Sequence, residues 1–229
     1  MASVILGSVQ PAYLAWIPFY LRMSESDVFV YLDDVEYSKN SFHNRNMIKT
    51  PNGPMYLTVP VKYKGNSRLT IREMPIDNIS GWQRKHWRAI SLNYAKAPFF
   101  SVLGPLLQDK IYSRQWSFLG DLNYALLELF REFIGINTPC YLSSESNVEG
   151  QANEKLVNLC KKYKSDSFIV KPGTEHYHPK EYFEAAGIGF TYFVPDLKEY
   201  PQLHGEFVKG LGILDFAMNC GPDSIQLLK

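Results

Sequence analysis

Two short apolar segments near the N-terminus constrain the fold most strongly. Val4 to Val9 is a β-branched apolar run, and residues 27–32 read DVFVYL. Strands with almost no polar alternation are buried on both faces, which is typical of parallel sheets. The connecting residues 12–23 have helical character, although Pro18 kinks or restarts any helix there. A strand, a helical crossover and a second buried strand predict an α/β fold whose sheet is mainly parallel and Rossmann-like.

The rest of the chain adds helices and further strands to this start. After Gly81, apolar and aromatic residues recur at helical spacing, and a second amphipathic pattern covers residues 122–134. These patterns predict a helical insertion at about 81–135. The final third alternates a helix at 153–163, a strand at 167–170, a short helix at 180–186, a strand at 189–194 and a helix at 211–219. Because no repeat or linker interrupts the chain, we predict one domain over residues 1–229.

Composition and termini narrow the class of function. The chain has 24 Lys+Arg against 23 Asp+Glu, a net charge of +1, which is too small for a protein that binds nucleic acid by neutralising phosphates. The N-terminus lacks the basic segment of a signal peptide, and no apolar run reaches the roughly 20 residues that span a bilayer. We therefore expect a cytoplasmic protein with no membrane insertion. Aromatic residues make up 14% of the chain and suit both a core and a pocket for a flat or sugar-like ligand.

Polar residues follow directly after both predicted N-terminal strands. Gln10 follows the first, and Asp33 and Asp34 follow the second. Ligands of open α/β sheets bind at the carboxyl ends of strands, so Gln10 is a candidate ligand-binding residue and an acid a candidate base. Adjacent side chains of an extended chain point in opposite directions, which favours one of the two acids over both. For Gln10 the alternative is that the residue belongs to a turn that simply ends the strand. For Asp33 and Asp34 the alternative is that they cap a helix or are solvated in a loop.

The stretch from residue 33 to residue 49 is polar and is predicted to be a connecting segment. It is dense in hydrogen-bond donors, including Lys39, Asn40, Asn44 and Arg45. Donors of this kind match phosphate or carboxylate groups, and the Arg45 guanidinium can form two parallel hydrogen bonds to an anion. A solvated loop is the alternative interpretation.

Histidine is the residue type that titrates near neutral pH, and His86 is the best candidate for a general base. It shares a helix face with Trp82, so a buried histidine with satisfied hydrogen bonds is the alternative. His176 and His178 lie beside prolines without a third ligand, and the three cysteines have no metal-type spacing. No metal site is therefore predicted, and the sequence leaves any cofactor and the oligomeric state open.

Several ordered motifs resemble the WbqC-like family of bacterial proteins. They are VQPAYLAWIPFY at 9–20, SDVFVYLDDVEYSK at 26–39, NRN at 44–46, IKT at 48–50, LTVPV at 57–61, YPQ at 200–202 and NCGP at 219–222. The family has histidine before Gln-Pro where this chain has Val9, an inner proline where it has Ala15, and glycine where it has Pro18. These departures alter the first loop and remove any imidazole from position 9.

The resemblance implies a role in bacterial surface-polysaccharide (O-antigen) biosynthesis. It suggests a transferase that moves an acyl or aminoacyl group, such as glycyl, to the amine of a nucleotide-linked amino sugar. In that interpretation Tyr13, Trp16 and Tyr37 stack on the sugar or base, Asn44 and Arg45 hold an anionic group, and Gln10 and Asp34 contact the substrate. His86 or Asp33 would remove a proton from the attacking amine.

Two other interpretations stay open. The first is a non-catalytic nucleotide- or sugar-binding component of a biosynthetic complex. The second is an adenylate-forming or nucleotidyl-transferring enzyme. For the second, the first histidine in the chain is His43, so the histidine signature of nucleotidylyltransferases is missing from the first strand–loop–helix segment.

Overall fold

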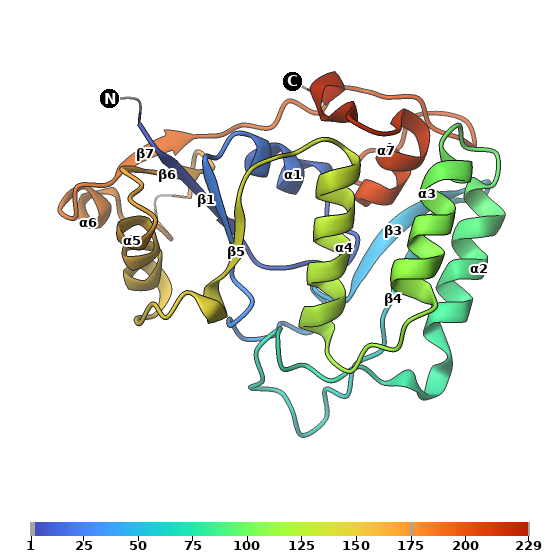
Figure 1. Ribbon diagram of the computed structural model, residues 1–229, viewed down its shortest axis with the longest axis horizontal. Coiled ribbons are helices and arrows are strands. Elements are labelled where there is room, and N and C mark those ends of the chain that lie inside the picture. The colour runs from blue at the N-terminus through green and yellow to red at the C-terminus, as the bar shows by residue number, and fades with distance from the viewer. Residues whose placement is uncertain (1–2, 175, 229) are drawn as a thin grey trace.

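A five-stranded parallel sheet organises the molecule (Figure 1). The computed structural model describes residues 3–174 and 176–228. The strands are β1 (Ile5–Val9), β2 (Val28–Tyr31), β5 (Cys140–Leu142), β6 (Ser167–Val170) and β7 (Gly189–Tyr192). Their spatial order is β5-β2-β1-β6-β7, and every adjacent pair is parallel. In chain order this is the arrangement 3-2-1-4-5 of Rossmann-like sheets, which confirms the predicted α/β class.

Helices cover both faces of the sheet, as the apolar strands require. On one face, Phe29 and Tyr31 of β2 pack against Phe19 of α1 (Ile17–Ser24), with ring centroids 5.6 and 6.2 Å from that of Phe19. On the other face, Leu6 and Val30 join a second core formed with helices α5 (Ala152–Lys162) and α6 (Lys180–Glu184). Alternate residues of one strand thus enter two different cores.

The predicted helical insertion lies between β2 and β5 in the sequence. It contains α2 (Trp82–Tyr94), α3 (Phe100–Leu107), a π-helical turn (Gln108–Tyr112) and α4 (Leu119–Phe133). After β7 comes α7 (Ile213–Cys220), which packs against α3 and α4. Short 3₁₀ helices are η1 (Asn78–Ser80), η3 (Ser143–Glu145) and η4 (Ser224–Leu228).

The expectation that residues 33–49 form only a connecting segment is wrong at its C-terminal end. Arg45–Thr50 is strand β3, which pairs antiparallel with β4 (Gly53–Thr58) across a tight turn. The strand was missed because Asn46 and Lys49 are polar, yet they are 0% and 1% exposed. Their burial is possible because both side chains are hydrogen-bonded inside the protein.

Lys49 fixes the long segment that returns from β7 to α7 across the molecule (Figure 1). Its Nζ donates hydrogen bonds to Gln202 Oε1 at 3.0 Å and to the Gly205 carbonyl oxygen at 3.2 Å. Nearby, the buried Asp215 carboxylate accepts hydrogen bonds from the Tyr94 and Tyr200 hydroxyls, at 2.8 and 2.9 Å. Burial raises the pKa of Asp215 above its ordinary value.

The first loop is held in an unusual conformation before α1 begins. Helix α1 starts at Ile17 with Pro18 in its first turn, where proline is tolerated. Leu14 has a φ of 46°, in the left-handed region, and its carbonyl oxygen accepts a hydrogen bond from Asn46 Nδ2 at 2.8 Å. Trp16 forms an isolated antiparallel bridge with Gly212. The loop is therefore clamped between β3 and the start of α7.

No helix in the described ranges 3–174 and 176–228 is long and apolar enough to cross a membrane.

Candidate functional site

A cavity of about 580 Å³ opens at the carboxyl ends of β1 and β6. Gln10 follows β1 directly, Lys171 follows β6, and Phe193 follows β7, and all three line the cavity. β1 is the strand from which the chain builds the sheet outward in both directions, so this is the topological switch point. Ligands of open α/β sheets bind at this location. We call it the switch-point cavity.

Aromatic side chains form much of its wall. The Trp16 and Phe42 rings meet edge to face, with centroids 4.5 Å apart, and Phe19 and Phe193 add further apolar surface. Trp16 is 38% exposed, which is unusual for a tryptophan and leaves its ring available to a ligand. Its indole Nε1 donates to Asn46 Oδ1 at 3.2 Å. The wall can therefore offer a flat apolar surface in a fixed orientation.

A directional hydrogen-bond chain sets the polarity of Gln10. The Ser38 backbone N–H donates to His43 Nδ1 at 3.2 Å, so Nε2 carries the proton of the neutral ring. That Nε2 lies 2.9 Å from Gln10 Oε1 and donates to it. Burial lowers the pKa of His43 to about 4, which keeps the ring neutral at pH 7. The Gln10 amide nitrogen, a donor, is left for a ligand in the cavity.

Two cations complete the cavity. Arg22 lies on α1 and Lys171 follows β6, and neither has a carboxylate within 4.0 Å in the part of the chain that the structure describes. Burial lowers the pKa of Arg22, because no anion offsets the loss of water around it. Among residues 3–174 and 176–228, no acidic residue lines the cavity. Its polar groups therefore suit an anionic ligand that also has a flat apolar part.

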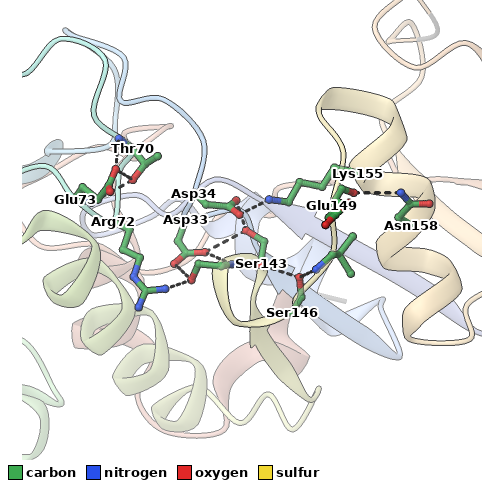
Figure 2. A network of polar contacts seen from close by, with 12 residues as sticks. Asp33, Asp34, Thr70, Arg72, Glu73, Ser143, Ser146, Glu149, Lys155 and Asn158 are labelled. Carbon is green, nitrogen blue, oxygen red and sulfur yellow. Dashed lines mark hydrogen bonds and ion pairs between the residues drawn. The ribbon is translucent and has the colours of Figure 1, made fainter.

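Asp33 and Asp34 lie outside this cavity, in a network that joins the ends of β2 and β5 (Figure 2). Asp33 is 3% exposed and accepts hydrogen bonds from the Ser144 backbone N–H at 3.0 Å and hydroxyl at 2.6 Å. Asp34 pairs with Lys155 of α5 and accepts a hydrogen bond from Ser143 Oγ. The Asp33 lone pairs are largely used by these serines, which ties two neighbouring strands together.

Tyr13 and His86 form a buried pair under the helical insertion. The Tyr13 hydroxyl lies 2.8 Å from His86 Nδ1 and 2.8 Å from the Tyr112 hydroxyl. Burial lowers the pKa of His86 to about 4. Its Nδ1 is engaged by the Tyr13 hydroxyl, and His86 is not part of the wall of the switch-point cavity.

Tyr37, Asn44 and Arg45 line a separate, smaller pocket of about 210 Å³. The loop from Tyr37 to Arg45 divides this pocket from the switch-point cavity, since its Ser41, Phe42 and His43 face the larger cavity. We call the smaller one the donor pocket. Of the nine candidate residues, the structure thus brings Gln10 and Trp16 together in one cavity, three in another, and the remaining four in two buried clusters.

The residues that sequence reasoning missed are Arg22, Phe42, Lys171 and Phe193. The signal for Lys171 was its position after a predicted strand, but the sequence does not show that β6 lies next to β1. Arg22 is an isolated cation in an otherwise apolar helical segment, which was the available clue.

The fold and cavity define a class: an α/β protein with a Rossmann-like parallel sheet and a cavity at its switch point. The sequence pattern of the WbqC-like protein family matches residues 10–227, and the chain belongs to that family. It is 32% identical over 222 residues, 96% of both chains, to a protein of Mycobacterium tuberculosis described as uncharacterized protein Rv1507c. No solved structure is significantly similar to it. Among the described residues, no three His, Cys, Asp or Glu side chains are grouped so that they could hold a metal ion.

Proposed function

We propose that this protein binds a nucleotide-linked amino sugar in the switch-point cavity and transfers an acyl or aminoacyl group to its amine. The observation that carries the ligand class is the cavity itself: aromatic walls, an amide donor at a switch point, and two cations that have no carboxylate within 4.0 Å among the described residues. The polysaccharide context and the transfer of a group such as glycyl rest on the family resemblance described above.

Each part of such a ligand has a matching part of the cavity. Trp16 and Phe42 would pack on the flat base or the apolar face of the sugar. Arg22 and Lys171 would pair with the diphosphate, which otherwise has no counter-charge in an apolar site. The Gln10 amide nitrogen would donate to a phosphate or carbonyl oxygen.

The transfer itself needs a proton acceptor. The neutral amine nitrogen forms a bond to the acyl carbon, the leaving group departs with the electrons of its bond, and the new ammonium loses a proton. His86 and Asp33 stay the predicted acceptors in this proposal. Both are buried and hydrogen-bonded in the present conformation, so either would act only after the surrounding wall opens.

This burial favours a second candidate, the non-catalytic binding component. The one histidine in the cavity wall, His43, has both nitrogens engaged and is poorly suited to accept a proton. A protein with this cavity and no accessible base would hold a nucleotide sugar for another enzyme.

One experiment separates these candidates. The purified protein is incubated with nucleotide-linked amino sugars and either an acyl thioester or an amino acid with ATP, and product mass and pyrophosphate are followed. N-acylated sugar supports the transferase; pyrophosphate release without acylated sugar supports an adenylate-forming enzyme. Thermal stabilisation by the sugar nucleotide without any product supports the binding component.

Arg22→Gln and Lys171→Gln test whether the ligand occupies the cavity. Each should weaken binding of the sugar nucleotide at least tenfold, while the exposed Lys64→Gln, with the same charge change, should leave it unaltered. Equal affinity for all three variants and the unaltered protein would refute the cavity as the binding site.

A further inference from the structure

The donor pocket contains hydrogen-bond donors that have no acceptor. Arg45 Nε is buried and has no hydrogen-bond partner among the described residues. Tyr37 lines the same pocket, and its hydroxyl makes no hydrogen bond to another described residue. Buried donors are nearly always paired in native proteins, so the unpaired guanidinium N–H at this small cavity indicates a site completed by a ligand.

The charge of the pocket has one sign. Lys39 and Arg45 line it, neither has a carboxylate within 4.0 Å in residues 3–174 and 176–228, and no acidic side chain is part of the wall. The two cations rest on aromatic faces instead. Lys39 Nζ lies 5.4 Å from the centroid of the Tyr63 ring, and the Arg45 guanidinium lies 5.1 Å from that of Tyr56. Ring contacts hold the cations in place and leave N–H groups for an anion.

Hydrogen bonds to backbone carbonyl oxygens fix the side chains of Arg45 and Asn44 and leave other donors of the pocket unpaired. The Arg45 Nη2 donates to the Asn40 carbonyl oxygen at 2.6 Å, which holds the guanidinium against the loop. Asn44 Nδ2 donates to the Val59 carbonyl oxygen at 2.7 Å and so anchors the loop on the end of β4. Asn44 is thus a positioning residue, while Tyr37, Lys39 and Arg45 supply free donors.

Size limits what the pocket can take. Its volume of about 210 Å³ is below the roughly 300–1,000 Å³ of sites for drug-sized ligands. A nucleotide sugar does not fit, but a single tetrahedral or planar oxyanion does.

We propose that the donor pocket binds a small oxyanion, the phosphate or carboxylate group of a second molecule distinct from the occupant of the switch-point cavity. This inference does not rest on the proposed function, because the donors and the volume define the ligand chemistry by themselves. Tyr37 contributes a hydroxyl donor, and Lys39 and Arg45 contribute charge.

The test is calorimetric titration of the full-length protein with two probes at low ionic strength, inorganic phosphate and glycine. Saturable binding of either probe is expected, and which of the two binds identifies a phosphate or a carboxylate ligand. The variants are Arg45→Gln, Tyr37→Phe, which removes only the hydroxyl, and Arg22→Gln in the switch-point cavity. Lys64→Gln is the matched control for charge, and thermal unfolding checks that each variant is folded.

We expect Arg45→Gln to weaken probe binding at least tenfold and Tyr37→Phe several-fold, with Arg22→Gln and Lys64→Gln unchanged. If Arg22→Gln loses probe binding while Arg45→Gln retains it, the anion binds in the switch-point cavity and the proposal is overturned. If both variants lose probe binding, the two pockets act as one shared site, which also overturns it. The proposal is likewise overturned if neither probe binds to the unaltered protein. Failure of sugar-nucleotide binding in the Arg22→Gln experiment above leaves this result unaffected.

Discussion

His43 determines which atom of Gln10 faces the switch-point cavity. The imidazole Nε2 lies 2.9 Å from Gln10 Oε1, and the Ser38 backbone N–H occupies the other ring nitrogen. With the ring neutral and its proton on Nε2, the Gln10 oxygen is the acceptor, and the NH₂ group of Gln10 is the part left to face the cavity. The cavity thus selects for a hydrogen-bond acceptor at this point.

Gln10→Glu should abolish that selection. The carboxylate still accepts from His43, but it offers no donor and adds negative charge beside an anionic ligand. We expect at least tenfold weaker binding of a nucleoside diphosphate, about 1.4 kcal/mol, measured by calorimetry. Gln10→Ala, which removes the donor without adding charge, should lose less. Equal losses in the two variants would show that charge at this position does not matter.

His86 should make the protein sensitive to mild acid. Burial lowers its pKa from 6.5 to about 4, so the unfolded chain binds a proton below about pH 6.5 that the folded protein excludes until about pH 4. The stabilising contribution is present above pH 6.5 and is lost as the pH falls toward 4, at about 1.4 kcal/mol per pH unit.

His86→Gln should reduce this loss, since a glutamine amide can still pair with Tyr13 but does not titrate. The measurement is the free energy of unfolding from urea denaturation between pH 7 and 4.5, with the exposed His176→Gln as the control. A slope against pH that is the same in His86→Gln as in the unaltered protein would contradict the assignment.

Asp33→Asn should destabilise the protein more than Asp34→Asn. The Asp33 carboxylate accepts hydrogen bonds from the backbone and hydroxyl of Ser144 and from Ser143 Oγ, whereas an amide would direct NH₂ toward some of these donors. We expect a loss of about 2–4 kcal/mol for Asp33→Asn, measured by chemical denaturation. Loss of activity at unchanged stability would instead support the predicted catalytic role of Asp33.

Gly212→Ala should disturb the switch-point cavity from a distance. A methyl group there would lie 2.6 Å from the Leu14 carbonyl oxygen, which is backbone and cannot rotate away. The first loop must shift, and Trp16 moves with it. We expect about 1–3 kcal/mol lower stability and weaker ligand binding. Gly187→Ala is the control for ligand affinity, because its added methyl meets no atom within 4 Å. Unlike Gly212, whose φ is −66°, Gly187 has a φ of +77°, so an alanine there is strained without touching the first loop, and ligand affinity should be unchanged.

Much of the fold was predictable from local patterns. The apolar runs that became β1, β2 and β6 and the helical spacing of α2 and α4 are properties of consecutive residues. Strand β3 was not predictable in this way, because its burial depends on partners from other elements, such as Leu14 for Asn46. Strand β5 has only three residues, too few to form a pattern.

The site was predictable only in part, for a related reason. Gln10 and Trp16 follow the first strand and were found from that position. Arg22 and Lys171 could not be assigned to the same cavity, because adjacency of β1 and β6 is a property of strand order. The sequence did indicate that the loop from Tyr37 to Arg45 is rich in hydrogen-bond donors. Which of its side chains line each pocket depends on the direction in which each one points.

The loop from Tyr37 to Arg45 forms a wall of both pockets, and the Tyr37 and His43 rings on it are 5.7 Å apart. The affinities of the two pockets for their ligands are then thermodynamically linked through this loop. If an occupant of the donor pocket tightens this wall and raises affinity in the switch-point cavity, the sugar nucleotide must raise affinity for the oxyanion by the same factor. In that case a single short loop would make binding in the two pockets cooperative.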